Sequence, residues 1–296
     1  MNFKNVTVAG SGVLGYQIAF QTAFQGFKVT VYDLNDEVLA KAKAKFSELS
    51  ECYKSDVNAT QEQLDNTFNN LSYCSNLAEA VKDADLLIEA VPENVDIKNE
   101  FYKQLSQVAP AKTVFATNSS TLLPSQFAEV TGRPEKFLAL HFANRIWDKN
   151  VAEIMGHSGT DQAVFDEVIE FSKAIGMLAF PLYKEQSGHL LNTMTWPMVL
   201  SAAELWAKDV SDPIHMDKMW MKVMGAEFGP FAIMDIVGLN TTYNIAKAYA
   251  DFNPSMNLVL EKLDAEMLNQ DRLGIQNGEG FYQYPNPVWE AADFLK

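Results

Sequence analysis

The sequence has few cysteines, no long apolar run and a shortage of positive charge. It contains only two cysteines, Cys52 and Cys74, which are too few for a disulfide framework and lack the spacing of a metal site. No apolar stretch approaches the roughly 18–20 residues that a membrane-spanning helix needs. The first residues, MNFKNVTVAG, lack the basic and apolar segments of a secretory signal peptide. These absences predict a cytoplasmic protein that does not enter a membrane and holds no metal ion.

Negative charge dominates the composition. The chain has 23 Lys and Arg against 38 Asp and Glu, for a net charge of −15. Such a field repels nucleic acid and anionic lipid at long range, so neither is an expected partner. It does not exclude an anionic ligand, because the N–H groups of a helix end bind anions locally and distant charges are screened by salt. The expected partner is therefore a small molecule.

The pattern of apolar residues changes along the chain. At 296 residues a single core nears its practical limit, so two domains are expected. Up to about residue 185, short β-rich runs alternate with helical patterns, which predicts βαβ units in a doubly wound, mainly parallel Rossmann-type sheet. The expected strands are Asn5–Ala9, Val29–Asp33, Leu86–Val91, Val114–Asn118, Phe137–His141, Val151–Met155 and Met177–Leu182. The expected helices are Leu14–Gln25, Asp36–Tyr53, Val95–Ala109 and Asp161–Ile175.

After residue 185 the pattern is helical, with little strand signal. Helical spacing of apolar residues covers Gly188–Lys208, Thr241–Tyr249 and Asn257–Gln270. We expect a dinucleotide-binding domain over residues 1–185 and an all-helical C-terminal domain over residues 186–296, with the active site in the cleft between them.

A glycine-rich turn follows the first expected strand. Gly10, Gly12 and Gly15 form the pattern G-x-G-x-x-G. In a dinucleotide-binding turn the first glycine permits the tight turn, the second lets the pyrophosphate approach the backbone, and the third allows close packing of helix on strand. The following helix, which Val13 and Leu14 open, offers unpaired N–H groups and a partial positive charge to phosphates.

Asp33 strengthens this interpretation. It follows Gly15 by 18 residues and ends the second expected strand. A carboxylate there accepts hydrogen bonds from the adenosine ribose hydroxyls and repels a 2′-phosphate. Leu34 and Asn35 come next, without an Arg or Lys, which favours NAD over NADP. The alternative is a surface carboxylate that happens to follow a glycine-rich turn.

A histidine and a glutamate form a candidate catalytic pair. Of the four histidines, His141 alone ends an expected strand, where open α/β sheets bind their ligands. Glu153 is the only ionisable residue in the apolar run Val151–Met155. A carboxylate buried alone costs several kcal/mol, so it requires a partner such as the imidazole. Glu153 would then orient His141 to accept an alcohol proton; the alternative is a polar strand end without catalytic function.

Six short motifs occur in order behind the glycine-rich turn. They are ADLLIEAVPEN at 84–94, TNSST at 117–121, HFAN at 141–144, SGHLLN at 187–192, GPFAIMDIVGL at 229–239 and GEGFY at 278–282. With these motifs the chain resembles the NAD-dependent L-3-hydroxyacyl-CoA dehydrogenase family over nearly its full length. The resemblance implies hydride transfer between NAD and carbon 3 of the substrate.

The resemblance also implies roles for individual residues. His141 matches the family's catalytic base, and Glu153 matches its orienting acid. Three polar residues match the surroundings of the reacting centre: Ser120, Asn144 and Asn192. Three more match the cofactor side near the nicotinamide: Glu93, Lys98 and Asn118. For some of them a structural role is the alternative, because Ser120 could cap a turn, Asn192 could be an interior helix residue and Lys98 could lie on a solvated helix face.

The segment after His141 departs from the family pattern. The family usually has a proline after the asparagine of this motif, whereas this chain has Arg145, followed closely by Trp147. In this the chain is similar to a branch of diketoreductase-like enzymes that act on substrates without CoA. The substrate is therefore either a 3-hydroxyacyl-CoA, interconverted with the 3-oxoacyl-CoA, or a free 3-hydroxy, 3,5-dioxo or sugar acid such as gulonate. A third interpretation, an NAD-binding protein without activity, is disfavoured because both His141 and Glu153 are present.

The helical region is also expected to assemble. It contains more amphipathic and Met-rich helix than a domain of about 110 residues buries alone. Members of the family that it resembles are dimers through this domain. We therefore expect a homodimer with two-fold symmetry.

Overall fold

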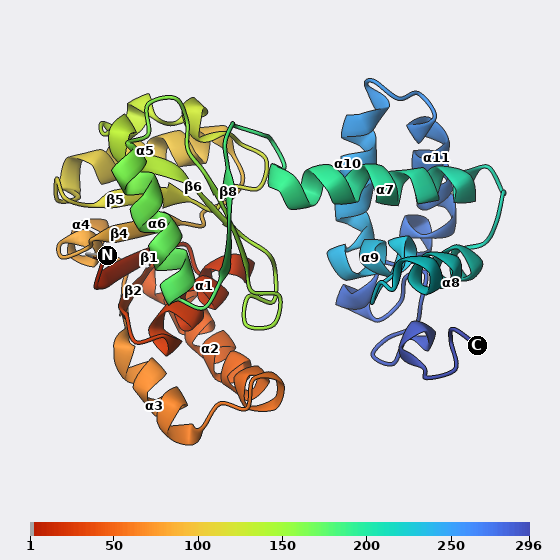
Figure 1. Cartoon of the computed structure of the whole chain (residues 1–296), viewed down its shortest axis with the longest axis horizontal. Coiled ribbons are helices and arrows are strands. Elements are labelled where there is room, and N and C mark those ends of the chain that lie inside the picture. The colour runs from red at the N-terminus through yellow and green to blue at the C-terminus, as the bar shows by residue number, and fades with distance from the viewer. Residues whose placement is uncertain (1–2) are drawn as a thin grey trace. The chain divides into compact units, whose positions relative to one another are not determined.

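The structure, a computed structural model, describes residues 3–296. It falls into two units, Met1–Leu190 and Leu191–Lys296. The strands of the first unit are β1 (Asn5–Ala9), β2 (Lys28–Tyr32), β3 (Leu71–Cys74), β4 (Leu86–Glu89), β5 (Val114–Thr117), β6 (Phe137–Phe142), β7 (Val151–Met155) and β8 (Leu178–Leu182). Its helices are α1 (Val13–Phe24), α2 (Asp36–Asp56), α3 (Gln61–Asn70), α4 (Leu77–Val81), α5 (Val95–Val108) and α6 (Gln162–Ala174) (Figure 1).

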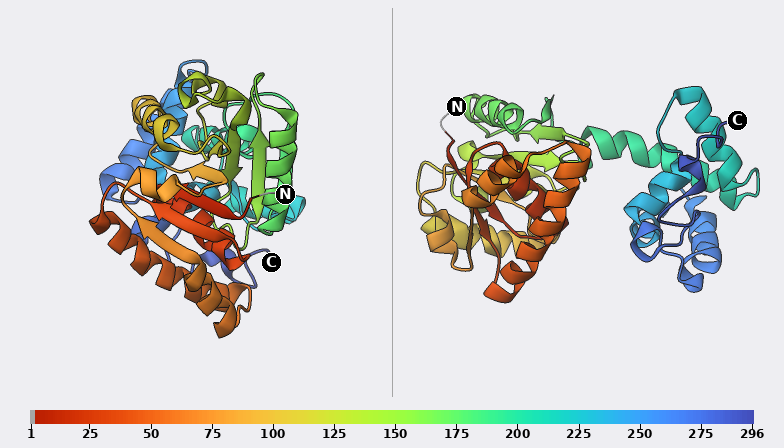
Figure 2. Two further views of the ribbon diagram at one scale, coloured as in Figure 1. Left: turned by 90° about the vertical axis from the view of Figure 1, so that its left-hand side faces the viewer. Right: turned by 90° about the horizontal axis from the view of Figure 1, so that it is seen from below.

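The strands of the first unit form one twisted sheet, whose members lie side by side in Figure 2. Their order is β3-β2-β1-β4-β5-β6-β7-β8. All neighbours are parallel except β6 and β7, which pair antiparallel. The chain leaves β1 in one direction and returns to β4 on its other side, so the switch point of a doubly wound sheet lies between β1 and β4. The expected fold class is confirmed.

Helices cover both faces of this sheet, which explains why its central strands are apolar throughout. In β4 the side chains of Leu86, Leu87 and Ile88 have no exposed surface, as expected for a strand between two helical layers. One core joins a sheet face to residues of α1, α2 and α6, and the other joins the opposite face to α4 and α5. A parallel sheet covered in this way places its ligand sites at the carboxyl ends of its strands.

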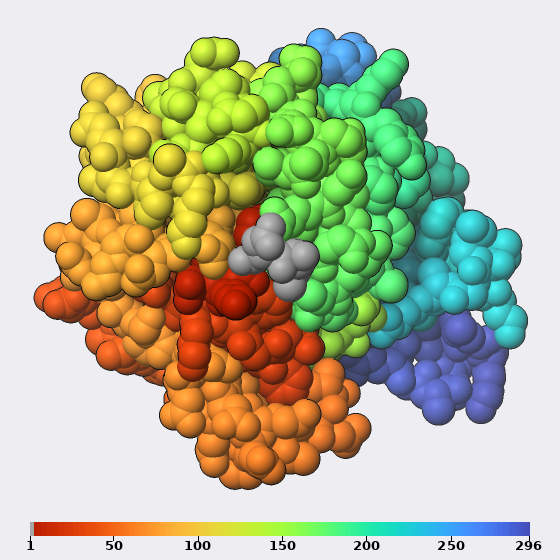
Figure 3. Space-filling model, turned by 60° about the vertical axis from the view of Figure 1, so that its left-hand side comes forward, coloured from red at the N-terminus to blue at the C-terminus, as the bar shows by residue number. Residues whose placement is uncertain are grey.

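Three elements between residues 61 and 81 had no counterpart in the sequence-based expectation. Helix α3 buries only Leu64 and Thr67, so it lacks an apolar stripe. Strand β3 is an edge strand without a fully buried residue, and α4 has only five residues. Their apolar periodicity was too short and too weak to be seen. Figure 3 shows the surface of the α2–α3 region in orange at the bottom of the view.

The second unit is all-helical in its regular structure. Helix α7 (His189–Ala207) leads into it, followed by α8 (Pro213–Met224), α9 (Pro230–Val237), α10 (Leu239–Ala250) and α11 (Met256–Glu266). The core of this unit contains residues of α7, α9, α10 and α11, among them Trp206, Phe231, Leu239 and Val259. Pro213 and Pro230 occupy the first position of a helix, where the missing N–H is not needed. None of the described helices combines the length and apolarity needed to span a bilayer.

Candidate active site

The glycine-rich turn joins the carboxyl end of β1 to the start of α1. At Gly10 φ is +98°, and a Cβ would lie 2.5 Å from the carbonyl oxygen of Ala90; a Cβ on Gly15 would lie 1.9 Å from the carbonyl oxygen of Gly10. Both positions therefore require glycine. A Cβ on Gly12 would meet nothing within 4 Å, so the backbone there is open to an approaching ligand. No described side chain caps the helix that begins at Val13, and its first N–H groups are available to a phosphate.

Asp33 follows β2 and contacts the same turn. Its Oδ2 accepts hydrogen bonds from the backbone N–H and the hydroxyl of Ser11, at 2.8 and 2.6 Å. Its Oδ1 accepts one from the backbone N–H of Leu34 at 2.8 Å. A carboxylate accepts about four hydrogen bonds, so Asp33 keeps capacity for a ribose hydroxyl. The open turn, the uncapped helix and this carboxylate together fit a dinucleotide.

His141 and Glu153 form a buried cross-strand pair. In the antiparallel ladder of β6 and β7 they are directly opposite each other, so their side chains project from the same face. Nδ1 of His141 lies 3.0 Å from Oε2 of Glu153, and both residues are buried. Because a carboxylate only accepts, Nδ1 carries the proton of the neutral ring, which leaves Nε2 as the basic nitrogen. Nε2 lies 3.2 Å from Oγ of Ser120.

A loop after β5 presents Ser120 to the histidine, and Glu93 organises this loop. Oε1 of Glu93 accepts hydrogen bonds from the backbone N–H groups of Ser120 and Thr121, at 3.1 and 2.9 Å, and from the hydroxyl of Ser119 at 2.6 Å. Burial opposes the charge of Glu93, but these hydrogen bonds and the nearby Lys98 ammonium hold its pKa below the usual value. Glu93 is therefore an anionic anchor of the loop at neutral pH.

Lys98 does not lie on a solvated helix face. Its side chain is 1% exposed, and Nζ donates to Oε1 of Glu89 at 2.6 Å while lying 3.5 Å from Oε2 of Glu93. Oε2 of Glu89 accepts further hydrogen bonds from the hydroxyls of Tyr102 and Thr117, at 2.9 and 2.8 Å. A buried ion pair is stable only when its remaining oxygens are satisfied in this way. Lys98 thus stabilises the carboxylates of Glu89 and Glu93, and Glu93 in turn holds the loop that carries Ser120.

Two asparagines accept hydrogen bonds from the backbone at the end of β6, the strand that carries His141. Oδ1 of Asn118 accepts from the backbone N–H of Phe142 at 3.0 Å. Oδ1 of Asn144 accepts from Nε2 of Gln17 at 2.8 Å, and Oε1 of Gln17 accepts from the backbone N–H of Arg145 at 2.9 Å. Because Oδ1 of Asn144 accepts from Gln17 and, at 3.0 Å, from the backbone N–H of Arg145, its amide N–H₂ is the group directed to other partners. Gln17 therefore orients Asn144.

Comparison with known proteins agrees with this geometry. The model of the 3-hydroxyacyl-CoA dehydrogenase NAD-binding domain matches residues 5–185, and the model of the C-terminal domain of the same enzymes matches residues 188–284. The chain belongs to the 3-hydroxyacyl-CoA dehydrogenase family. As a member it is an NAD-dependent oxidoreductase acting on CH–OH groups, so the expected enzyme class and cofactor are confirmed.

Relatives and solved structures are similar to nearly the whole chain. The human mitochondrial hydroxyacyl-coenzyme A dehydrogenase is 31% identical over 95% of this chain and 91% of its own length. A probable 3-hydroxybutyryl-CoA dehydrogenase of Bacillus subtilis is 29% identical over 96% of this chain and 98% of its own. A diketoreductase of solved structure, whose description names catalysis of dicarbonyl compounds, is 48% identical in sequence, with a TM-score of 0.91 over 96% of this chain and 100% of its own.

Three other predicted site residues are Val13, Leu14 and Asn192. Val13 is exposed at the start of α1, whereas Leu14 packs against the core below this helix. Asn192 lies on α7 in the second unit. Their roles in the family's reaction stay predictions.

The sequence interpretation missed three residues that shape the site of this dehydrogenase. Gln17 lies inside α1 and carries no motif signal. Glu89 ends the apolar run Leu86–Glu89 within the ADLLIEAVPEN motif. Like Glu153, it is a carboxylate in an apolar strand and therefore requires a buried partner. His189 stood in the SGHLLN motif, and its ring stacks on His141 with 4.5 Å between centroids. Only the tertiary structure reveals this contact.

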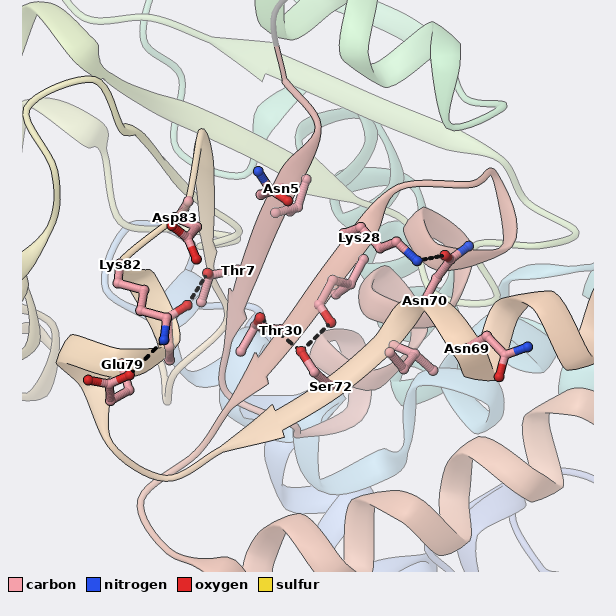
Figure 4. Close-up of a pocket in the computed structure, with 15 residues that line it drawn as sticks. Asn5, Thr7, Lys28, Thr30, Asn69, Asn70, Ser72, Glu79, Lys82 and Asp83 are labelled. Carbon is pink, nitrogen blue, oxygen red and sulfur yellow. Dashed lines mark hydrogen bonds and ion pairs between the residues drawn. The ribbon is translucent and has the colours of Figure 1, made fainter.

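A polar pocket on the opposite edge of the sheet does not compete with this site. It has a volume of about 210 Å³ and is lined by the amino ends of β1, β2 and β3. As Figure 4 shows, its side chains bond to one another: Lys28 Nζ donates to Asn70 Oδ1 at 2.7 Å, and the hydroxyls of Thr30 and Ser72 lie 3.0 Å apart. A pocket at the amino ends of the strands, on the edge away from the switch point, is not the expected reaction site.

Proposed function

We propose that this dehydrogenase interconverts a 3-hydroxy and a 3-oxo group, with His141 as the general base in oxidation and the general acid in reduction. The observation that carries the proposal is the buried pair of His141 and Glu153, with Nε2 of His141 beside the hydroxyl of Ser120. Bound NAD supplies the hydride acceptor in oxidation and, as NADH, the hydride donor in reduction. The turn of Gly10, Gly12 and Gly15 and the carboxylate of Asp33 hold it.

Each residue of the pair has a defined task. In oxidation, Nε2 of His141 takes the hydroxyl proton of the substrate, and the ring becomes imidazolium. Glu153 stabilises that positive charge through Nδ1 and keeps the ring oriented, because its carboxylate is itself fixed by the backbone N–H of Leu190 at 2.8 Å. The hydroxyl of Ser120 and the amide of Asn144 hydrogen-bond the substrate oxygen. Reduction is the reverse sequence.

The cofactor side is assembled from the strands next to the switch point. We place Glu93, Lys98 and Asn118 near the nicotinamide end. Their contacts support this, because Glu93 fixes the backbone of the Ser120 loop and Asn118 fixes the backbone beside His141. Loss of any of them would displace the reacting groups rather than remove a charge from the cofactor.

The first candidate substrate is an (S)-3-hydroxyacyl-CoA. The models of both domains of the family match the chain, and the human and Bacillus relatives carry CoA substrates in their names. The polyanionic CoA handle would need local positive charge, for which α2 offers Lys43 and Lys54. Lys54 is already paired with Glu51 at 2.8 Å. An exposed ion pair of this kind contributes little free energy, so the ammonium group of Lys54 can exchange Glu51 for a phosphate of CoA.

The second candidate is a dicarbonyl compound or 3-oxo acid without CoA. It is favoured by the 48% identity to diketoreductase and by the turn after His141. In this turn Nε1 of Trp147 donates to Oδ2 of Asp56 at the end of α2, at 2.9 Å, and Arg145 pairs with Asp148 at 3.0 Å. The guanidinium of Arg145 is therefore neutralised by carboxylates, which disfavours a polyanionic group on this side of the site.

One set of assays tests the function and separates the substrates. Oxidation of NADH is followed with acetoacetyl-CoA, with acetoacetate and with a 3,5-dioxo ester. His141→Ala should lower kcat about 10²–10⁴-fold with each accepted substrate, while the dissociation constant of NADH changes little. Near-wild-type turnover of His141→Ala would refute the proposed function.

The same assays include a matched pair of lysine variants. Lys54→Gln should raise KM for acetoacetyl-CoA about two- to fivefold at low salt if the thioester is the substrate. Lys173→Gln, which breaks the equivalent exposed pair with Glu170 on α6, should leave KM unchanged. Efficient turnover of the free compounds, with no response to Lys54→Gln, would select the second candidate.

We further propose that the chain is a homodimer formed through its second unit. Large apolar side chains on α7 and α8 are exposed in the described chain, with Met194 at 69%, Met219 at 58% and Val223 at 73%. Exposed apolar surface of this kind is typical of a protein interface.

The cytoplasmic location stays a prediction, and the human relative carries a mitochondrial name.

A further inference from the structure

A second histidine packs on the one proposed to be the base. The rings of His141 and His189 are stacked, with 4.5 Å between their centroids and 18° between their planes. His189 is 1% exposed. Neither of its ring nitrogens has a hydrogen-bond partner among the described residues. A buried imidazole that makes no hydrogen bond is unfavourable, so stacking against His141 is the main described interaction of this ring.

The backbone on both sides of His189 is attached to the groups that flank His141. The N–H of Gly188 donates to the carbonyl of Ser120 at 3.1 Å, and the N–H of Leu190 donates to Oε1 of Glu153 at 2.8 Å. His189 itself has a φ of +53°, a left-handed conformation that is unfavourable for a side chain with a Cβ. The surrounding hydrogen bonds therefore hold the backbone of His189 in an unfavourable conformation, and this backbone places the ring against His141.

The electrostatic surroundings keep His189 neutral. Burial and the neighbouring His141 lower the pKa of His189 to about 4, although Glu153, the backbone of Ser120 and Glu93 act in the opposite direction. At neutral pH the ring is therefore uncharged. It therefore adds no like charge when His141 becomes imidazolium.

We propose that His189 is a positioning residue for the reaction: its ring covers one face of His141, excludes water from it, and keeps the imidazole aligned with Glu153 and Ser120. This inference rests on the proposed function, in which His141 is the proton acceptor. The ring plane, rather than a ring nitrogen of His189, performs the task, because both nitrogens are buried without a partner in the described chain.

A metal site is the alternative interpretation of the cluster that His141, Glu153 and His189 form. His141, Glu153 and His189 offer ligand atoms within 4.8 Å of one another. Nearly parallel stacked rings do not direct their nitrogen lone pairs to a common point, however, and a tetrahedral ion needs converging donors. The geometry therefore favours stacking over coordination.

Two variants separate the ring from its nitrogens. His189→Ala removes the ring and should lower kcat about 10–100-fold, because a displaced base loses its alignment. It should also move the acid limb of the oxidation profile, measured from about pH 5 to about pH 9, to higher pH, because water then reaches and stabilises the imidazolium. His189→Phe keeps a flat ring of similar size and should restore kcat to within about threefold of wild type and return the limb to its original position.

Controls make the result interpretable. His157→Phe replaces a histidine of the same unit whose Nε2 contacts the carbonyl of Pro134, away from the pair, and should leave the pH profile unchanged. Thermal unfolding and NADH binding verify that each variant is folded. Wild-type kinetics of His189→Ala, or a His189→Phe variant as impaired as His189→Ala, would overturn the positioning role. Activity retained by His141→Ala would instead refute the proposed function itself.

Discussion

Replacing Glu153 with glutamine removes a charge from the reacting pair with little change of shape. Glu153 is 2% exposed, and its two oxygens contact Nδ1 of His141 at 3.0 Å and the N–H of Leu190 at 2.8 Å. An amide oxygen can still accept one of these hydrogen bonds. Glu153→Gln should therefore fold and bind NADH, while losing the charge-assisted part of the contact with the imidazolium.

The size of the effect follows from this contact. A hydrogen bond to a charged group contributes about 1.5–3 kcal/mol and a neutral one about 0.5–1.5 kcal/mol. The difference of about 1–2 kcal/mol applies in the transition state, where the proton moves to His141, and each 1.4 kcal/mol changes a rate about tenfold. Weak screening at this buried position increases the effect. We expect kcat to fall about 10–100-fold.

The pH profiles provide the more specific test. Without the carboxylate the imidazolium is less stable, so the acid limb of oxidation and the alkaline limb of reduction should both move to lower pH. Because a catalyst cannot change the equilibrium constant, the ratio of the forward and reverse specificity constants must stay fixed at each pH. Glu170→Gln, an exposed glutamate on α6, serves as the control. Unchanged limbs with a normal kcat would contradict the proposed role of Glu153.

Three further results are expected. Asp33→Ser should weaken NADH binding about tenfold and reduce the discrimination against NADPH, measured by fluorescence titration; a preference of the unmodified protein for NADPH would contradict the role of Asp33. Burial raises the pKa of Asp235 to about 6; because this value lies above that of the unfolded chain, its contribution to stability is present below about pH 4 and is lost as the pH rises through 6. The free energy of unfolding in urea should thus fall by about 1–3 kcal/mol from about pH 4 to about pH 7, and less in Asp235→Asn. Light scattering should give about twice the chain mass of 33.1 kDa, and a monomer at micromolar concentration would exclude the proposed dimer.

The sequence alone determined the parts of the protein whose physics is local. The glycine-rich turn is predicted because its backbone needs the conformational freedom of glycine. The buried strands are predicted because their residues form apolar runs. Both signals lie in adjacent residues of the sequence. Gly10 and Gly15 lie where a Cβ would collide with backbone. The pairing of Glu153 with His141 could also be inferred, because a lone carboxylate in an apolar strand requires a partner and the next strand offers one.

The tertiary structure decided what depends on contacts between distant segments. Lys98 has the sequence context of an exposed helix face, yet it is buried on Glu89 because α5 packs over the carboxyl end of β4. Gln17 reaches Asn144 across more than a hundred residues. His189 contacts His141 only because the chain after β8 returns to β6, the strand that carries His141. Such partners leave no periodic signal, since the free energy that selects them arises when separate elements bury polar groups against each other.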